Sequence, residues 1–280
     1  MVGPLALVRL ARTLHQINRE NIDPIVQKKI RRTYLSGIIL ERYDSQNNTA
    51  DVAGYKCQFC TYAGFSYLFN ELFLNQAYLF STSKDNPFII DCGSNIGMSV
   101  LYFKMMYPDA EILAFEPDDD AFRCLQVNVD NNNFKSVSVI KKALSTREGK
   151  LDFYYDPDNP GALKMSTIRE RMPKEKRVVE ATRLSNYVND EVDFLKLDVE
   201  GAEVGVIEDL NTHGKLPHIK QMAIEYHHHI FRDTDTLSNI LGLLETAGFG
   251  YQIESSLGRP FNRETFQDIL IYAYRKAINT

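Results

Sequence analysis

FIIDCGSNIG, the stretch from Phe88 to Gly97, combines an apolar run, an acid, a glycine-containing turn and the start of a helix pattern. Such a junction between a strand and a helix leaves the first backbone N–H groups of the helix without partners. A nucleotide, or the charged end of a nucleotide-like cofactor, binds at such a place. Glu116 follows nineteen residues after Gly97, at the end of the next apolar run. That spacing suits an acid that binds both hydroxyls of a ribose, so the sequence predicts an adenosine-bearing cofactor.

The residues between the glycines favour one such cofactor over another. In the dinucleotide-binding pattern GxGxxG, the middle glycine lets the backbone touch a pyrophosphate. Here Asn95 stands between Gly93 and Gly97 in place of that glycine, and Asp91 precedes the turn. An acid at this position repels phosphate and attracts an ammonium group. The loop therefore favours S-adenosylmethionine (SAM) over NAD, although glycine turns after strands also occur for purely steric reasons.

Length and composition limit the classes of protein to consider. A chain of 280 residues can form one domain, or one domain with an appendage. The net charge of −5 argues against nucleic acid as the main partner. No apolar run approaches the ~18 residues that indicate a membrane span. The N-terminus lacks the basic region and the cleavage site of a secretory signal. We therefore expect neither a nucleic-acid partner nor a membrane span.

The four cysteines do not follow the pattern of a disulfide scaffold. Cys92 and Cys124 lie in apolar patterns that are typical of buried residues. Cys57 and Cys60 form a single CxxC pair, whereas a structural zinc site needs four ligands. A metal or redox role for this pair is the minor alternative. The cysteine usage predicts a reduced, cytoplasmic setting.

Apolar strands alternate with helix patterns from Phe88 onward, which predicts βαβ units and a parallel sheet. The last two apolar runs have only a short polar connection, so we expect them to pair antiparallel. Residues 155–177 read as a mobile loop near the site. We expect an N-terminal helical extension and cap over residues 1–80, with residues 1–45 helical, and a cofactor-binding domain over residues 81–280. Further expected strands lie at residues 136–144, 193–201 and 222–229.

Several motifs together resemble the FkbM family of SAM-dependent methyltransferases. The most specific is DFLKLDVEGAE at 193–203, and FIIDCGSNIG, Glu116-Pro117 and KKALS at 141–145 also match. The resemblance extends from about Val52 to Tyr274. It implies an α/β fold with a Rossmann-like, doubly wound seven-stranded sheet whose last strand is antiparallel. It also implies SAM as methyl donor, and usually transfer to oxygen on a natural-product or sugar hydroxyl.

The resemblance implies which residues hold the cofactor. The turn after the first strand would surround the methionine part of SAM, through Asp91, Gly93, Ser94, Asn95 and Gly97. Glu116 would bind the ribose, and Ala143 and Leu144 would flank the adenine. In an open α/β sheet such ligands lie beyond the carboxyl ends of the strands.

Candidate catalytic residues stand at strand ends on the acceptor side. Methyl transfer needs alignment and deprotonation of the acceptor, so a carboxylate or a histidine near the methyl group is expected. Asp198 is the leading candidate, with binding of the SAM amino group as an equally good alternative. Glu200 has an alternative role as an acid that stabilises a helix start. Glu225 and His227 lie two apart on a strand, share one face, and could line the acceptor pocket, with His227 as a base.

Other residues carry weaker signals. A metal site that combines Glu225, His227 and Asp198 is an alternative, but the prediction is that the site holds no metal. Ser166 could contact the acceptor, although loop serines are usually turn formers. Tyr78 could cover the cofactor, although an aromatic at helical spacing is more often a core residue.

Two other functions compete with a methyltransferase. A NAD-dependent oxidoreductase would carry a YxxxK pair on a helix, whereas Tyr272 and Lys276 fall on the expected terminal strand. Side chains four apart on a strand lie ~13 Å apart, too far to cooperate. A SAM-binding protein without activity is the second alternative, against which the acids at Asp198, Glu200 and Glu225 argue. The expected partner is a small-molecule or glycan acceptor, and the sequence gives no oligomeric state.

Overall fold

The computed structural model describes residues 28, 31, 48–231, 233–255 and 266–276. The predicted helical stretch 1–45 lies outside these described residues, apart from Lys28 and Arg31. The proposed domain boundary near residue 80 therefore stays a prediction. Among the described helices, none combines the length and the apolar character that crossing a membrane requires.

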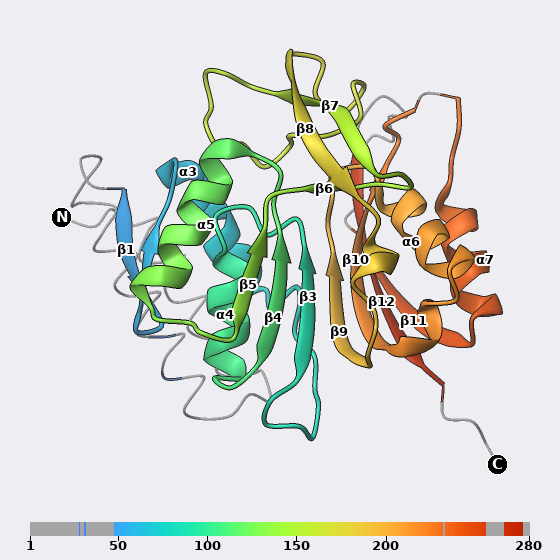
Figure 1. The fold of residues 1–280 in the computed structure, drawn as a ribbon, viewed down its shortest axis with the longest axis horizontal. Coiled ribbons are helices and arrows are strands. Elements are labelled where there is room, and N and C mark those ends of the chain that lie inside the picture. The colour runs from blue at the N-terminus through green and yellow to red at the C-terminus, as the bar shows by residue number, and fades with distance from the viewer. Residues whose placement is uncertain (1–27, 29–30, 32–47, 232, 256–265, 277–280) are drawn as a thin grey trace, which may run out of the picture.

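A seven-stranded sheet forms the centre of the molecule (Figure 1). In spatial order its strands are β11 (Phe249–Ser255), β12 (Gln267–Arg275), β10 (Ile219–His228), β9 (Val192–Leu197), β3 (Phe88–Cys92), β4 (Glu111–Phe115) and β5 (Val137–Ile140). Strand β12 pairs antiparallel with both of its neighbours, and the other pairs are parallel. The predicted doubly wound sheet with an antiparallel last strand is confirmed.

The order of strands creates a switch point between β3 and β9. From β3 the chain proceeds outward through β4 and β5, and from β9 it proceeds in the other direction through β10. The two strands pair in parallel, with Asp91 opposite Lys196 and Cys92 opposite Leu197. Loops that leave such a pair diverge to opposite faces and open a crevice at the carboxyl ends.

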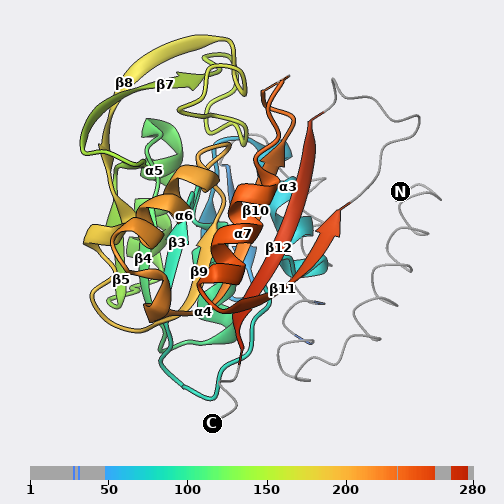
Figure 2. The same ribbon diagram turned by 90° about the vertical axis from the view of Figure 1, so that its right-hand side faces the viewer.

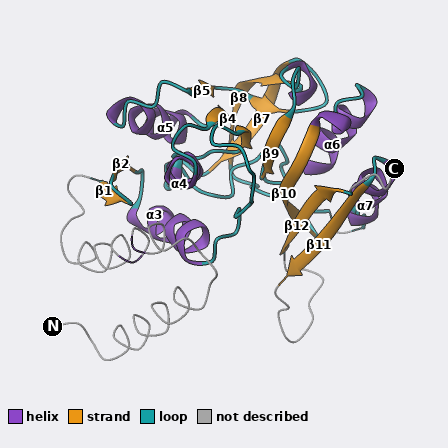
Figure 3. Cartoon of the chain, turned by 90° about the horizontal axis from the view of Figure 1, so that it is seen from below, coloured by secondary structure: helices purple, strands orange, loops and turns teal. Residues whose placement is uncertain are grey.

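Helices cover both faces of this sheet (Figure 3). One face carries α3 (Tyr62–Phe69), α4 (Met98–Met106) and α5 (Asp119–Asn131), and the other carries α6 (Glu203–Thr212) and α7 (Leu237–Thr246). Each face has its own buried apolar cluster. Three short helical segments of the described chain lie between these helices in sequence, at Asn70–Leu74, Leu184–Asn186 and Leu216–His218.

An N-terminal hairpin extends the first of these layers. Strands β1 (Thr49–Val52) and β2 (Tyr55–Gln58) pair antiparallel. The amide side chain of Asn128 on α5 accepts from the backbone N–H of Gln58 at 2.6 Å and donates to its carbonyl at 2.8 Å. The hairpin is therefore attached to α5 by the kind of paired bonds that join strands.

A second, three-stranded sheet lies over the carboxyl ends of the main sheet (Figures 1 and 2). It consists of β6 (Ala143–Leu144), β8 (Glu175–Thr182) and β7 (Gly149–Tyr155). We call this three-stranded sheet the roof. Arg177 on β8 bonds the carboxylates of Asp118 and Asp119 at the start of α5 and so connects the roof to the helices that cover the main sheet.

Two expectations from the sequence differ from this arrangement. The single strand expected at 136–144 is two strands in different sheets, because the chain turns at Lys142, whose N–H donates to the carbonyl of Ile140. The loop expected at 155–177 begins and ends inside β7 and β8. Its middle is tied to β7 by the bridge between Tyr154 and Ser166.

Candidate active site

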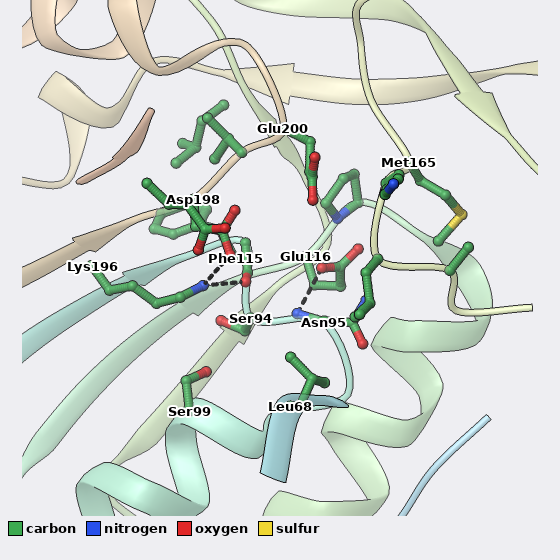
Figure 4. A pocket seen from close by; sticks show the side chains of 18 of the residues that line it. Leu68, Ser94, Asn95, Ser99, Phe115, Glu116, Met165, Lys196, Asp198 and Glu200 are labelled. Carbon is green, nitrogen blue, oxygen red and sulfur yellow. Dashed lines mark hydrogen bonds and ion pairs between the residues drawn. The ribbon is translucent and has the colours of Figure 1, made fainter. Parts of the chain in front are cut away.

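A cavity of about 370 Å³ opens at the carboxyl ends of β3, β4, β9 and β10, below the small sheet (Figure 4). Its volume lies in the range of ligand pockets, about 300–1,000 Å³. Its wall includes most of the residues that the sequence singled out, namely Gly93, Ser94, Asn95, Glu116, Ala143, Leu144, Asp198, Glu200 and Glu225.

The turn after β3 is shaped by a close backbone contact at Gly93. Its φ is +84°, a left-handed value that disfavours a side chain. A Cβ at this position would lie 1.7 Å from the carbonyl oxygen of Asp198. The loops that follow β3 and β9 therefore touch through their backbones, and only glycine at residue 93 permits it.

Glu116, at the end of β4, lies against the same turn. One carboxylate oxygen accepts from the backbone N–H of Asn95 (Figure 4), and the other accepts from that of Asp118, both at 2.8 Å. Burial raises the pKa of Glu116 to about 8. Each oxygen keeps a second lone pair, so the carboxylate can still accept from two vicinal hydroxyls.

The predicted adenine region is an apolar part of the wall. Ala143 and Leu144 are buried in the short strand β6 and line the cavity together with Phe115 and Pro117. Because β6 is an edge strand of the roof, this wall combines the carboxyl end of β4 with one edge of the roof.

Two predicted cofactor residues lie behind the wall. Asp91 is 0% exposed, accepts from the hydroxyl of Ser99 at 2.5 Å, and faces the ammonium of Lys196 at 3.4 Å. Gly97, with φ +81°, precedes α4 and faces Leu125. Asp91 and Gly97 therefore fix the shape of the turn without lining the cavity. Ser99 and Lys196, which both contact Asp91, line it instead.

Lys196 is a site residue that the sequence analysis missed. It is buried in β9, donates to the carbonyl of Gly93 at 2.6 Å, and lies 3.3 Å from a carboxylate oxygen of Asp198. Burial opposes its charge, but Asp198 and Asp91 raise the pKa of Lys196 above its ordinary value. The ammonium therefore neutralises acid directly below the glycine turn. A lysine between Leu195 and Leu197 in a fully buried strand is a local signal that could have identified it.

Carboxylates gather at the opposite end of the cavity. Asp198 follows β9, Glu200 follows it on the next turn, and Glu225 lies on β10. Burial and the neighbouring Asp198 raise the pKa of Glu200 and of Glu225 to about 8. Burial and Asp198 also raise the pKa of Glu71, which the sequence analysis missed, to about 7. Asp198 itself stays 22% exposed and faces the cavity.

His227 lies behind these acids, with a side chain only 1% exposed. Its Nδ1 lies 3.0 Å from a carboxylate oxygen of Glu203, and that oxygen also accepts the backbone N–H groups of Val199 and Gly201. Burial favours the neutral ring, but Glu203 and Glu200 outweigh it and raise the pKa of His227 to about 10. The predicted pair of Glu225 and His227 does share one face of β10.

Two further predictions concerned Tyr78 and Ser166. Tyr78 is buried, and its hydroxyl donates to Glu225 at 2.8 Å and to Asp198 at 3.4 Å, so it lies at the acidic end of the cavity. Ser166 is buried and donates to the carbonyl of Glu200 at 2.5 Å. The serine therefore shapes the loop, in line with the alternative given for it.

Arg171 from the same loop also escaped the sequence analysis. Its guanidinium is buried and bonds one carboxylate oxygen of Glu200, at 2.7 Å from Nε. The basic residues between 169 and 177 resemble a solvated charge run, so no local pattern distinguished this one.

The cysteines contribute no disulfide within the described residues, where all four thiols are free. Cys92 and Cys124 are buried, as predicted. Cys60 lies 3.4 Å from Cys124, sulfur to sulfur, and Cys57 points into the core instead.

The charges of the wall fit a cationic cofactor better than a phosphate-bearing one. Six acidic and four basic side chains line the cavity. Two of the four bases, Arg171 and Lys196, are already paired with acids. Four of the six acids have pKa values raised to about 7 or 8, so a cation beside them, such as the ammonium or sulfonium of SAM, favours their ionised form, whereas a pyrophosphate opposes it.

Comparisons with known proteins show which family this chain resembles. Residues 91–252 match the family model described as "Methyltransferase FkbM domain". Methyltransferase sdnD of Sordaria araneosa is 30% identical over 65% of this chain and 81% of its own length. The 31-O-demethyl-FK506 methyltransferase FkbM of Streptomyces tacrolimicus is 26% identical over 65% of this chain and 81% of its own. A solved structure, methyltransferase FkbM from Methylobacillus flagellatus KT, aligns with 96% of this chain and 60% of its own. It does so with a TM-score of 0.44 and 16% identity.

Proposed function

We propose that this chain, which belongs to the FkbM family of methyltransferases, transfers a methyl group from SAM to a hydroxyl oxygen. SAM is the methyl donor of the family, as the sequence predicted. The proposed acceptor is a sugar, a glycan or a natural product. The observation that carries the proposal is the half-buried carboxylate of Asp198, whose backbone touches the glycine turn and whose side chain lines the acidic end of the cavity.

Relatives support oxygen as the acceptor atom. The protein from Streptomyces tacrolimicus is named for methylation of an oxygen of FK506. The wall of the cavity suits a ring-shaped acceptor as well, because Tyr67, Leu68, Leu72, Phe153 and Met165 present apolar surface. Apolar and aromatic surface binds the hydrophobic faces of sugar rings and of polyketide-like molecules.

When bound, SAM supplies a methyl group on a sulfonium, which is a good leaving group. The side chains have two tasks: to align the acceptor oxygen with that methyl group and to receive its proton. Asp198 is the proposed base, because its side chain is 22% exposed, more than the 15% of Glu200 and the 14% of Glu225. Tyr78 and Lys196 hold one of its oxygens, so the other is free to accept a proton.

Asp198 has a second role that competes with the first. In this role its carboxylate would hold the amino group of SAM, because the Asp198 backbone touches the turn at Gly93 and Lys196 contacts both residues. Glu200 and Glu225 complete the negative surface in either case. His227, the alternative base, is shielded from the cavity by Glu200, which lies 3.2 Å from its Nε2.

Ligand-induced stabilisation tests the cofactor. Purified protein should gain thermal stability with S-adenosylhomocysteine (SAH), the product of methyl transfer, and not with NAD. A saturating ligand at 100 times its Kd stabilises a protein by about 2.7 kcal/mol. Equal shifts with both ligands, or none with SAH, would reject the proposal.

Acceptor identification tests the activity. Extracts incubated with the protein and isotope-labelled SAM should yield a methylated small molecule or glycan that mass spectrometry detects, and its ether linkage would establish O-methylation. Binding of SAH without any labelled product would instead support the alternative of a catalytically silent SAM-binding protein. The cytoplasmic setting and the lack of a nucleic-acid partner stay predictions.

A further inference from the structure

The side chain of His227 faces carboxylates through both of its ring nitrogens. Its Nδ1 contacts Glu203, and its Nε2 makes no hydrogen bond although it is buried. Around Nε2 lie oxygens of Glu200 at 3.2 Å, of Glu225 at 3.9 Å and of Asp268 at 4.0 Å. A buried nitrogen that faces several carboxylate oxygens needs positive charge beside it, either its own proton or a bound cation that takes the place of that proton.

The tautomer of the neutral ring follows from the Glu203 contact. The same Glu203 oxygen accepts two backbone N–H groups, so it acts as a carboxylate acceptor. Nδ1 therefore donates, and Nε2 of the neutral ring carries the lone pair. A histidine whose one nitrogen donates to a carboxylate, and whose other nitrogen is free, has the arrangement found behind metal-ligating histidines.

We propose that His227 Nε2, together with the carboxylates of Glu225 and Asp268, binds a divalent cation. The sequence predicted no metal at this site, and the geometry of the described residues points to one. Mn²⁺ and Mg²⁺ fit a set with two carboxylates and one imidazole, with Mn²⁺ the better match because it also accepts nitrogen ligands. The binding of the cation rests on these three side chains alone, whereas its role rests on the proposed function.

Sheet geometry fixes the three ligands. Glu225 and His227 alternate with Tyr226 on β10 and so share one face. Asp268 is the antiparallel partner of His227 on β12. Directly opposed residues have Cβ atoms about 4.5–5.5 Å apart. The ligand set is therefore built on two paired strands and not on loops.

The distances suit one ion. Ligand atoms held about 2.1 Å from a common ion lie about 3.0–4.2 Å from one another. The separations of Nε2 from the Glu225 and Asp268 oxygens, 3.9 and 4.0 Å, fall in that range. All three ligand atoms lie within 4.8 Å of one another. Asp268 is 51% exposed, so its side chain can adjust.

The neighbouring cations make their shorter contacts with acids other than Glu225 and Asp268. Arg171 bonds the Glu200 oxygen that faces His227 and lies 3.9 Å from Asp268. Lys196 pairs with Asp198 and Asp91. Tyr78 donates to Oε2 of Glu225 and leaves Oε1 directed at His227. On binding, the cation would displace the protons that the raised pKa values of His227 and Glu225 retain, and two carboxylates with a neutral imidazole would then balance its charge.

A cation here would assist the proposed reaction. Asp198 lies 3.9 Å from the same nitrogen, so a hydroxyl bound to the cation comes close to the proposed base. A divalent cation lowers the pKa of an oxygen that it binds. The acceptor proton would pass to Asp198, the oxygen would form its bond to the methyl carbon, and the carbon–sulfur bonding pair would return to sulfur.

Mn²⁺ binding to the full chain tests the site. Protein freed of metal with EDTA and then titrated with MnCl₂ should remove one equivalent of free Mn²⁺, read from its electron paramagnetic resonance signal. Pulsed spectra of the bound Mn²⁺ should show modulation from an imidazole nitrogen. His227→Ala should abolish that modulation, and Asp268→Asn should weaken binding at least tenfold.

His228→Ala is the matched control. His228 is the next residue of β10 and belongs to another group of candidate ligands, with His229 and Asp235. This variant should bind Mn²⁺ like the unchanged protein. Loss of binding in His228→Ala with retention in His227→Ala would overturn the proposal, as would the absence of any bound equivalent.

SAH binding, measured on the same samples, separates the possible failures. A variant that still binds SAH is folded, and Asp268→Asn decides the question if His227→Ala does not fold. Mn²⁺ binding without SAH binding would support the cation site and reject the methyltransferase proposal. SAH binding without Mn²⁺ binding would reject the cation site alone.

Discussion

The two ends of the cavity are built in different ways. At the end beside α4 the backbone forms the surface: Gly93 touches the carbonyl of Asp198, and backbone N–H groups position Glu116. At the other end side chains from separate strands meet around His227. The shape of a surface formed by backbone is determined by a few consecutive residues. The arrangement of side chains from separate strands is determined by the whole fold.

The largest effect is expected at the acidic end. Asp198→Asn should reduce turnover by about 10³-fold if Asp198 is the base, since general bases contribute about 10²–10⁴-fold. SAH affinity, measured by calorimetry, separates its two roles. An unchanged Kd with lost turnover identifies the base, and a weakened Kd identifies the group that holds the amino group. Asp130→Asn, at an exposed position of α5, is the control. Full activity in Asp198→Asn would remove the residue from both roles.

At the glycine turn beside α4, the addition of a single methyl group should reduce both activity and stability. Gly93→Ala would place a Cβ against the Asp198 carbonyl, so the turn must move. A displacement of about 1 Å near reacting groups costs about 100-fold in rate, and we expect that loss in kcat/KM together with a lower melting temperature.

Gly54→Ala controls for backbone strain in this experiment. Gly54 has a similar φ of +94°, but nothing lies within 4 Å of an added Cβ. It should lose stability without loss of activity. Equal effects of the two substitutions would show that the contact at Gly93 has no special role.

Glu116→Ala should weaken SAH binding at least tenfold, or about 1.4 kcal/mol, because the ribose hydroxyls lose their acceptor. Glu111→Ala, at the exposed start of the same strand, should leave the Kd unchanged. Calorimetry on both variants measures the difference. An unaffected Kd in Glu116→Ala would place the ribose elsewhere.

The smallest effect is a pH dependence at the same residue. With a pKa of about 8, raised by burial, Glu116 ionises only near that pH, so SAH affinity should rise from pH 6.5 to 8 and level off above. The SAH affinity should change by no more than about tenfold per pH unit. Glu116→Gln should reduce this pH dependence, and the dependence that remains belongs to other groups of the cavity such as Glu200 and Glu225, whose pKa values are also about 8.

Stability should change in the opposite direction. The folded pKa of Glu116 lies above its unfolded value of 4.5, so its protonated form favours folding. Its contribution to the free energy of unfolding is complete below pH 4.5 and is lost as the pH rises through about 8. Denaturant titrations of the unliganded protein and of Glu116→Gln would reveal the difference.

Local patterns predicted the sheet and the cofactor turn because each depends on neighbouring residues. The strand–turn–helix at Phe88–Gly97 and the apolar run of β9 both formed as expected. The short polar connection between the last two apolar runs correctly indicated antiparallel pairing.

The roof was not predicted because its strands carry charged residues along much of their length. Strand β8 alternates between exposed and half-buried positions over Glu175–Glu180, and such a run resembles a solvated loop. Likewise Glu71, Arg171 and Asp268 reach the cavity only through tertiary packing, which no local spacing encodes.

The contact between Gly93 and Asp198 has a consequence for how enzymes with this architecture can diverge. The cofactor side and the acceptor side of the cavity meet at this one backbone contact. Substitutions at residues 198–200 that suit a new acceptor would therefore also disturb the binding of the methyl donor. Selectivity has to evolve at the rim, where α3 and the β7–β8 connection supply interchangeable side chains. Libraries that keep Gly93 and residues 198–200 and randomise only the cavity residues of α3 and of the β7–β8 connection should retain affinity for SAM, while the range of acceptors changes.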